Sequence, residues 1–178
     1  SLQDVITMQW SMYRYHSSLE ATHPFSSPWW SWPLIVRPLW MDVEYLPGGM
    51  VSTIVAMGNP CIWWFSLPSL IVSAWKAVRR RDRVSIYIVS VFLFQWMPYV
   101  FITRCLFIYH FYMNVPVFIL SIADFLKDSW SDRCGRAFVL GYLCVTLFLF
   151  VIFYPVISGV AVTHGYKESL RWFSSWLF

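Results

Sequence analysis

The stretch HPFSSPWWSWPL, residues 23–34, places three tryptophans, three prolines and one histidine within twelve positions. A continuous helix is excluded here, because proline lacks a backbone donor and its ring clashes with the preceding turn. The serines and the histidine would be costly inside lipid without hydrogen-bond partners, and the tryptophans are too many for a solvated loop. The stretch therefore predicts a rigid segment without regular structure at a membrane surface, suited to holding an amphipathic ligand.

The composition of the whole chain indicates a membrane protein. Of its 178 residues, 58% are hydrophobic and 12% are charged, with a mean hydropathy of +0.56, whereas a soluble domain carries about 25% charged residues. The net charge of +4 is small, and no basic stretch is interleaved with aromatic residues in a polar context, so a nucleic-acid partner is excluded. Because the chain begins at Ser1 and shows no signal peptide, we expect it to be the C-terminal piece of a longer protein.

Four stretches are apolar enough to cross a bilayer, which takes about 20 residues of helix: residues 54–78, 84–102, 115–126 and 137–157. The third is short, so that it either spans with the preceding IYHFYMN, residues 108–114, or dips into the membrane from one interface. The predicted fold class is an all-α polytopic membrane protein with about four transmembrane helices.

Basic residues predict the orientation of these helices. KAVRRRDR, residues 76–83, and KDSWSDRCGR, residues 127–136, form two short loops separated by two spans. Short basic loops stay in the cytoplasm, so both ends of the chain are expected outside. We therefore divide the chain into an extracytoplasmic part, residues 1–49, and a transmembrane part, residues 50–178, whose C-terminal tail is extracytoplasmic.

The extracytoplasmic part begins with a predicted surface helix over residues 1–22. Its apolar positions recur at helical spacing: Leu2, Val5, Met8, Met12, His16 and Leu19. For His16, a buried histidine bonded to a backbone carbonyl and a ligand-binding histidine both stay open. The tryptophans that follow are expected to form an aromatic belt at the headgroup level: Trp29, Trp30, Trp32 and Trp40.

The motifs match a known family when they are taken together and in order. HP-x-S-S-x-W-x-x-WPL is followed by RP, then by GNP-x-x-WW, and then by R-x-x-x-F-x-YH. Over nearly its whole length the chain resembles the C-terminal region of bacterial protein O-mannosyltransferases, which are related to the dolichyl-phosphate-mannose–protein mannosyltransferases.

The resemblance implies a GT-C glycosyltransferase of the bacterial plasma membrane. The reaction implied moves mannose, with inversion, from polyprenyl-phosphate-mannose to a Ser or Thr hydroxyl of an exported protein. No cofactor is implied, and the other partners would be membrane lipids and the N-terminal part of the same chain. In the family, the acidic residues that activate the acceptor lie in a first outer loop that this sequence does not contain. Its catalytic residues are therefore unknown, and Asp42 and Glu44 are expected to be solvated carboxylates.

A lipid-phosphate donor requires groups that stabilise phosphate charge, and arginine does so with two parallel N–H donors. Arg37 and Arg104 are the candidates, although Arg104 could instead reach from a helix end to the interface. His23 and His110 could donate to the phosphate or the sugar, and Asn59 could bind a ligand or cap a helix. Ser27 and Trp30 complete the predicted substrate-binding set. Three histidines at positions 16, 23 and 110 lack a recognised metal-binding spacing, so no metal is expected.

Two alternatives remain at this point. A lipid-linked-sugar transferase could use another acceptor, such as lipid A or a polysaccharide, because the motifs do not specify the acceptor. A transporter or a non-catalytic membrane subunit is disfavoured, because transporters carry charges within their spans. Here Asp124 lies near the cytoplasmic end of the third span.

The predicted topology can be tested with a reporter enzyme that is active only outside the cytoplasm. Fusion after residue 178 should give activity, and fusion after Arg81 should give none, since Arg81 lies in the more basic loop. Activity at Arg81 and silence at residue 178 would reverse the side assigned to every candidate residue.

Overall fold

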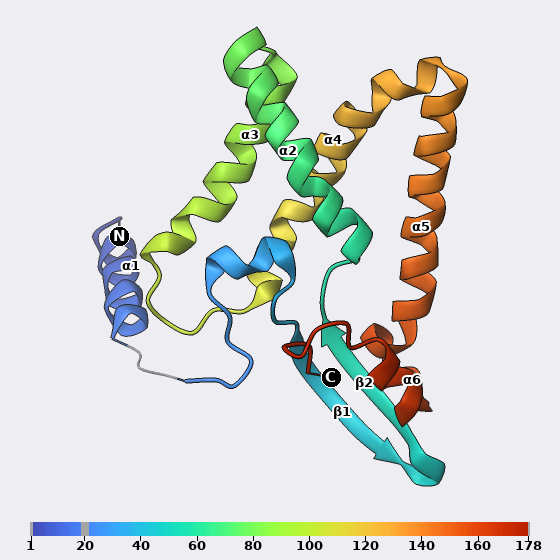
Figure 1. Ribbon diagram of the computed structural model, residues 1–178. Coiled ribbons are helices and arrows are strands. Elements are labelled where there is room, and N and C mark those ends of the chain that lie inside the picture. Colours follow the sequence, from blue (N-terminus) through green and yellow to red (C-terminus); the bar gives the residue numbers. More distant parts are fainter. Residues whose placement is uncertain (1, 19–21, 178) are drawn as a thin grey trace.

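The computed structural model describes residues 2–18 and 22–177 and confirms a polytopic helical membrane protein (Figure 1). Within these residues, four helical segments are long and apolar enough to cross a membrane: Pro60–Arg80, Arg83–Phe101, Ile108–Ser131 and Arg133–Ser158. The α-helices are α1 (Leu2–Ser17), α2 (Pro60–Arg80), α3 (Arg83–Trp96), α4 (Val115–Leu126), α5 (Arg133–Ser158) and α6 (His164–Ser169). Short 3-10 helices are η1 (Trp29–Leu34), η2 (Pro47–Gly49), η3 (Met97–Phe101), η4 (Ile108–Asn114) and η5 (Lys127–Ser131).

The third span consists of a 3-10 helix followed by an α-helix, and together they are long enough to cross the membrane. The 3-10 helix η4, which contains IYHFYMN, runs directly into α4, so the expectation that this segment extends the span is confirmed. The fourth span begins at Arg133, four residues before its predicted start, because Asp132 caps α5 through the backbone N–H groups of Cys134 and Gly135.

The first span was predicted to start at Ile54, and this prediction is wrong. Strands β1 (Leu39–Leu46) and β2 (Met50–Ala56) form an antiparallel hairpin, and β3 (Val162–Thr163) pairs with β2. The sequence over Val51–Val55 is rich in β-branched residues, which favour strands, and it was read as helix because it is also apolar. The expected division at residues 49 and 50 falls in the turn of this hairpin.

The sheet is joined to the end of α5, at the lower end of the molecule in Figure 1. Thr53 Oγ1 donates to the Val156 carbonyl at 3.1 Å, and the Gly159 N–H donates to the Thr53 carbonyl at 3.0 Å. We call this end of the molecule the sheet end. The opposite end, where α2 meets α3 and α4 meets α5, is called the basic end because it holds Arg79–Arg83 and Arg133–Arg136.

The tryptophan-rich stretch was expected to lack regular structure because of its prolines, and this prediction is wrong. Residues 29–34 form the 3-10 helix η1. A 3-10 helix accommodates Pro33 at its end. Trp32 is fully buried and does not belong to a membrane belt, whereas Trp30 is 59% exposed. Ile35, the residue after η1, has a φ of 52°, which is uncommon for a β-branched residue.

The carbonyl groups of this stretch accept hydrogen bonds from tryptophans of other elements. Trp96 Nε1 of α3 donates to the Trp29 carbonyl at 3.1 Å, and Trp63 Nε1 of α2 donates to the Trp32 carbonyl at 2.8 Å. Trp64 Nε1 donates to the Leu34 carbonyl at 3.2 Å, and Trp176 Nε1 donates to the Ile35 carbonyl at 2.6 Å. We call residues 29–35 with these four indole donors the tryptophan hub.

The start of α2 explains the GNP-x-x-WW motif. Asn59 caps the helix by accepting the Cys61 N–H at 3.0 Å, and Pro60 occupies the first turn, where no backbone donor is needed. Gly58 lies against the Trp63 indole so closely that an added Cβ would be 1.5 Å from a ring carbon. Glycine at 58 therefore lets Trp63 reach the tryptophan hub.

Helices α2 and α4 are joined by polar contacts that run toward the basic end. Ser121 Oγ of α4 donates to Ser69 Oγ at 3.0 Å and lies 3.3 Å from Ser73 Oγ, both of which belong to α2. Asp124, which was expected near this end of the span, lies 2.9 Å from Lys76 Nζ and 2.6 Å from Lys127 Nζ. The buried carboxylate is thus paired.

Gly58→Ala should destabilise the protein strongly, because the Trp63 ring cannot move without breaking its bond to the tryptophan hub. Overpacking of this kind costs about 3 kcal/mol or more, and the thermal midpoint of the purified full-length protein should fall by several degrees. Gly141→Ala on α5 is the matched control, since no atom lies within 4 Å of the added Cβ. Equal midpoints for the two variants would contradict the packing described.

Candidate functional site

A polar cavity lies at the sheet end, between the segment before η1 and the loop before η4. Its volume is about 670 Å³. We call it the polar pocket, and it is lined by Thr22, His23, Pro24, Ser26, Ser27, Pro28, Trp29, Ile102, Thr103, Arg104, Cys105 and Leu106. Three of the predicted site residues, His23, Ser27 and Arg104, are thereby brought together from segments about 80 positions apart.

Backbone and ring contacts hold the two walls of the polar pocket together. The Ser27 N–H donates to the Leu106 carbonyl at 2.8 Å, and the His23 ring meets Phe107 edge-on at 5.0 Å. His23 Nδ1 accepts the Phe25 N–H at 3.2 Å, so a neutral His23 carries its proton on Nε2. His23 can therefore donate a hydrogen bond to a ligand through Nε2.

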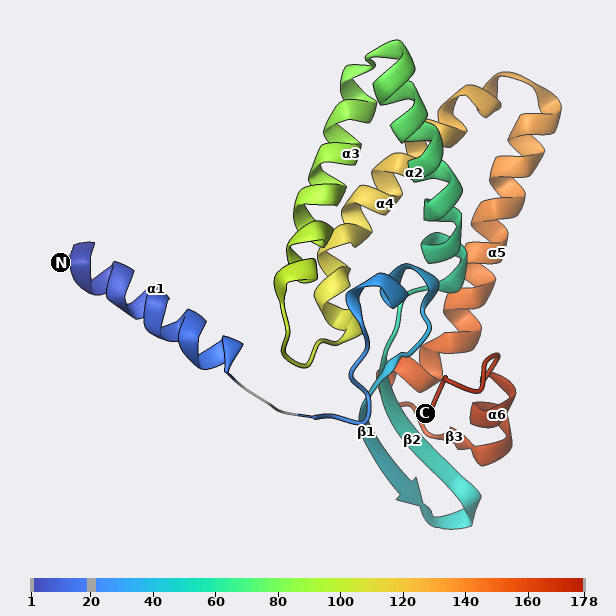
Figure 2. The same ribbon diagram turned by 60° about the vertical axis from the view of Figure 1, so that its left-hand side comes forward.

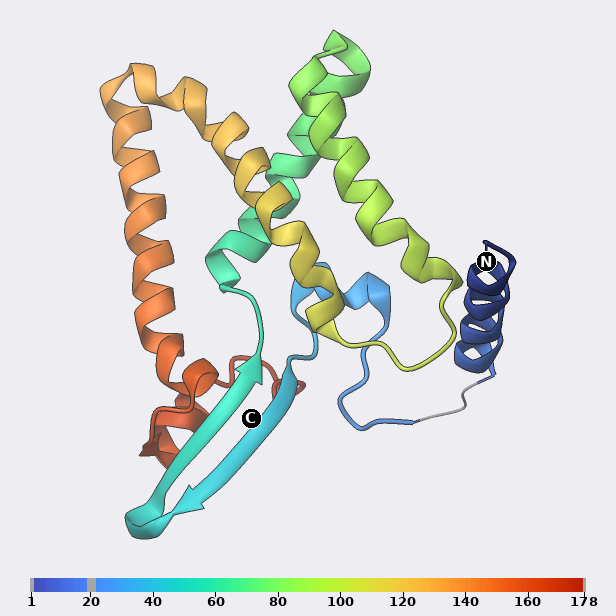
Figure 3. The ribbon, with the colours of Figure 1, turned by 180° about the vertical axis from the view of Figure 1, so that it is seen from behind.

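Arg104 is half-buried and lies between two cavities. It also lines a cavity of about 540 Å³ between α1 and residues 101–104, and its NH1 lies 3.2 Å from His16 Nδ1. A guanidinium can only donate, so His16 accepts at Nδ1. This contact with a side chain replaces the backbone carbonyl considered for His16. No residue of α1 is buried, and α1 lies apart from the other helices in Figures 2 and 3.

The two adjacent serines of the polar pocket differ in what their hydroxyls do. Ser27 is 4% exposed, and its Oγ accepts the Trp32 Nε1 hydrogen bond at 2.9 Å. The neighbouring Ser26 is half-buried, lines the same pocket, and has no side-chain hydrogen bond within the described residues. Ser26 is thus the freer hydroxyl, although Ser27 was the predicted ligand. Thr22 and Thr103 add two further hydroxyls that were not predicted.

Four of the predicted residues lie outside the polar pocket: Trp30, Arg37, Asn59 and His110. The exposed Trp30 and the half-buried Arg37 do not line it, and Arg37 has no ion pair within the described residues. His110 is half-buried and stacks on Tyr109 at 4.3 Å, with its Nδ1 2.9 Å from the Phe107 carbonyl. Its contacts with Phe107 hold the loop that follows the pocket-lining residues 102–106.

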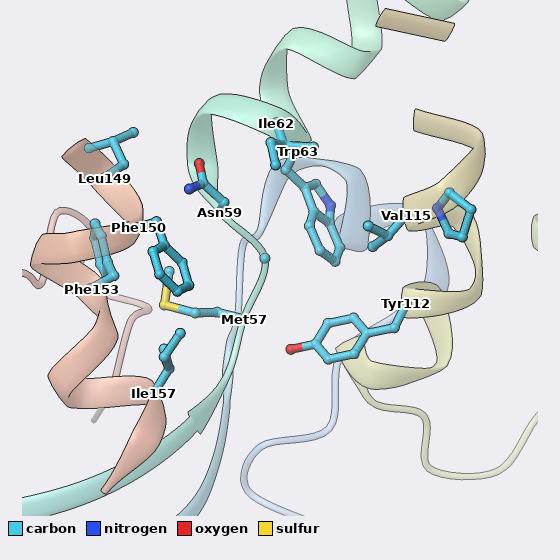
Figure 4. A pocket seen from close by; sticks show the side chains of 12 residues that line it. Met57, Asn59, Ile62, Trp63, Tyr112, Val115, Leu149, Phe150, Phe153 and Ile157 are labelled. Carbon is cyan, nitrogen blue, oxygen red and sulfur yellow. The ribbon is translucent and has the colours of Figure 1, made fainter. Parts of the chain in front are cut away.

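Asn59 lines a different and largely apolar cavity of about 560 Å³ between α2, η4, α4 and α5 (Figure 4). Both ends of its amide are engaged, because Oδ1 caps α2 and Nδ2 donates to the Thr146 carbonyl of α5 at 3.0 Å. Capping, the alternative considered for this residue, is what the structure shows. Substrate binding by Asn59 would require these bonds to break.

The polar pocket contains donors and a cation but no carboxylate. Its described lining includes no Asp or Glu, and Asp42 and Glu44 are exposed on β1, as expected. Nowhere in residues 2–18 and 22–177 do three His, Cys, Asp or Glu side chains gather as a metal site would require. Such a pocket can bind an anion and hydroxyl groups, but its described lining supplies no carboxylate to act as a general base.

These features define a class: an integral membrane protein with four spans and a cationic polar pocket at one end of the bundle. The chain belongs to the family described as the C-terminal four TMM region of protein-O-mannosyltransferase, which matches residues 1–176. The resemblance seen in the motifs is therefore confirmed.

Curated relatives are named polyprenol-phosphate-mannose–protein mannosyltransferase. The protein from Corynebacterium glutamicum is 25% identical over 184 residues, covering 93% of this chain and 35% of the relative. That from Mycobacterium tuberculosis is 26% identical over 199 residues, covering 98% of this chain and 38% of the relative. The chain thus spans little more than a third of the length of these relatives.

One solved structure shares the fold. It is the Saccharomyces cerevisiae protein O-mannosyltransferase Pmt1-Pmt2 complex bound to the sugar donor, with a TM-score of 0.78 and 20% identity. The match covers 99% of this chain and 27% of that chain. The arrangement of the four spans with the small sheet therefore recurs in a distant protein.

Replacing each serine with alanine should show which of the two hydroxyl groups stabilises the fold. Ser27→Ala leaves the buried Trp32 indole N–H without an acceptor, which costs about 1–3 kcal/mol, so the thermal midpoint should fall. Ser26→Ala removes no hydrogen bond to any described residue and should leave the midpoint unchanged. A larger loss for Ser26→Ala than for Ser27→Ala would contradict the assignment of the two hydroxyls.

Proposed function

We propose that the protein containing this chain transfers mannose from polyprenyl-phosphate-mannose to Ser or Thr hydroxyls of exported proteins. The names of the curated relatives support this donor and a protein acceptor, and the family membership supports the reaction class. The chain supplies part of the donor site, and the residue that activates the acceptor comes from the rest of the protein, because the described lining of the polar pocket has no carboxylate.

The observation that carries this proposal is the position of Arg104. Its guanidinium lies at the mouth of a pocket that also holds His23 and the free hydroxyl of Ser26. A phosphate bound there would meet a cation and neutral donors without a repelling carboxylate. The adjoining cavity between α1 and residues 101–104 includes the apolar side chains of Met12, Phe101 and Ile102, which suit the first isoprene units of the donor.

The chemistry of the donor explains why an arginine is needed. When the bond between mannose and phosphate breaks, negative charge builds on the phosphate oxygens. A bound guanidinium stabilises this charge more than it stabilises the intact donor. Arg104 therefore acts mainly on the rate of transfer, whereas His23 and Ser26 orient the phosphate and the sugar hydroxyls.

We further propose that the sheet end faces the outside of the bacterial plasma membrane and the basic end faces the cytoplasm. The two loops at the basic end carry most of the basic residues of the chain. Donor and exported acceptor would then meet on the outer side.

The test is mannose transfer to an acceptor peptide by the purified full-length protein. Arg104→Ala should lower kcat roughly a hundredfold or more, the usual loss when one donor to a developing anion is removed, with a smaller change in the KM for the donor. Arg104→Lys should recover only part of the rate, since an ammonium cannot form two parallel bonds.

Arg37→Ala is the matched control, because Arg37 is half-buried at the same end but does not line the polar pocket. Its turnover, corrected for folded protein, should stay close to that of the unmodified enzyme. If Arg104→Ala also keeps near-normal turnover, the polar pocket does not hold the phosphate. If Arg37→Ala alone loses turnover, the phosphate lies near Arg37 instead.

A further inference from the structure

The basic end concentrates charge that the proposed transfer reaction does not use. Its cationic side chains are Lys76, Arg79, Arg80, Arg81, Arg83, Lys127, Arg133 and Arg136. Its carboxylates are Asp82, Asp124, Asp128 and Asp132. Cytoplasmic loops of membrane proteins commonly carry more cations than carboxylates. A binding site is indicated only where cations have no carboxylate partner within the protein.

Most of the carboxylates are already occupied within the protein. Asp124 is paired with the two lysines, Lys76 and Lys127, at 2.9 and 2.6 Å. Asp82 caps α3 by accepting the Ser85 N–H at 2.8 Å, and hydrogen bonds from Ser85 hold the pKa of Asp82 below its usual value. Asp132 caps α5 in the same way. These carboxylates neutralise the lysines and the helix ends rather than the arginines.

The arginines are left uncompensated. Arg79, Arg80, Arg81 and Arg83 are all exposed, and none forms an ion pair in the described part of the chain. The Arg80 guanidinium lies over the Trp75 ring, with 4.8 Å between its central carbon and the ring centroid. This contact uses the face of the guanidinium, so its N–H groups can still donate hydrogen bonds to a ligand. Four exposed guanidinium groups thus lie within residues 79–83, and the carboxylate among them, Asp82, caps α3 rather than pairing with an arginine in the described part of the chain.

The position of this turn along the bilayer normal determines which part of a lipid molecule lies next to the arginines. Residues 81–82 connect α2 to α3, and Arg81 adopts a left-handed conformation with φ of 51° that closes the end of α2. One turn earlier in α2, Val78 is 78% exposed and Trp75 is 49% exposed, as expected for residues that face acyl chains and the interface. The arginines therefore lie at the level of the lipid headgroups.

We propose that the arginine turn, Arg79–Arg83, binds the phosphate headgroups of anionic phospholipids. Guanidinium groups form two parallel bonds to phosphate oxygens, and clusters of four or more basic residues next to a transmembrane helix bind anionic lipid surfaces. A nearby cavity of about 300 Å³ lined by Lys76, Arg80, Asp82, Lys127 and Asp128 is not the binding site, because two carboxylates line it. The site is the exposed turn itself. It is independent of the polar pocket at the opposite end.

The test uses the full-length protein in neutral detergent micelles, to which phosphatidylglycerol or phosphatidylcholine is added. Phosphatidylglycerol should raise the thermal midpoint and should stay bound in native mass spectrometry, whereas phosphatidylcholine should do neither. Each arginine near an anionic surface contributes about a fivefold gain in affinity. Changing all four arginines to glutamine should therefore weaken binding more than a hundredfold.

The charge-preserving variant with lysine at the same four positions is the matched control. It should keep most of the phosphatidylglycerol effect, and raising the salt concentration should weaken the effect in both the control and the unmodified protein. Free inorganic phosphate at equal concentration should not reproduce the rise in midpoint; an equal rise would identify a phosphate site rather than a lipid site. Unchanged phosphatidylglycerol binding by the glutamine variant would overturn the proposal, and mannose transfer, which depends on the polar pocket, reports separately on the proposed function.

Discussion

The hydrogen bonds between indole N–H groups and the carbonyls of residues 29–35 connect parts of the chain that would otherwise have little reason to meet. A 3-10 helix leaves carbonyl groups without internal partners, and at a membrane interface such groups must find other donors. Trp63 and Trp64 of α2, Trp96 of α3 and Trp176 near the sheet supply them. Each indole fills space with its rings and satisfies one carbonyl with its nitrogen. The polar pocket depends on this arrangement, because one of its walls is the chain that leads into η1 and the other precedes η4.

Much of the fold could be predicted from the sequence because each span carries a signal of its own. Length and apolarity located four spans, and of the two alternatives for the short third span, extension by residues 108–114 is the one that the structure shows. The hairpin was not predicted, because the short apolar run Val51–Val55 is compatible both with a strand and with the beginning of a membrane-spanning helix. Pairing with Leu39–Leu46 decides between them, and pairing depends on another segment of the chain.

The candidate site was harder to predict, because residue type does not show which polar atoms remain free. Three of the seven predicted residues, His23, Ser27 and Arg104, line one pocket. The Ser27 hydroxyl, however, is used by Trp32, whereas that of Ser26 has no partner among the described residues. Asn59 was selected for its amide, which turned out to be fully engaged in capping α2 and holding α5. Trp32 was assigned to the membrane interface, although its indole fills the core. The Trp32 indole that engages Ser27 is only five residues away, but residue type alone does not show that the indole turns toward it. The Thr146 carbonyl that engages Asn59 lies 87 positions away, where a local pattern carries no information.

The bond between Trp176 and the Ile35 carbonyl also affects the order of events during synthesis. These residues are separated by 141 positions, so at about 5–20 residues per second the ribosome needs roughly 7–28 s to make the second after the first. During that interval the Ile35 carbonyl lacks this donor. The strained backbone at Ile35 is locked only when the tail folds back. The neighbouring pocket therefore reaches its final structure only after Trp176 has been synthesised, and a chain that ends before Trp176 lacks one of the four donors of the tryptophan hub.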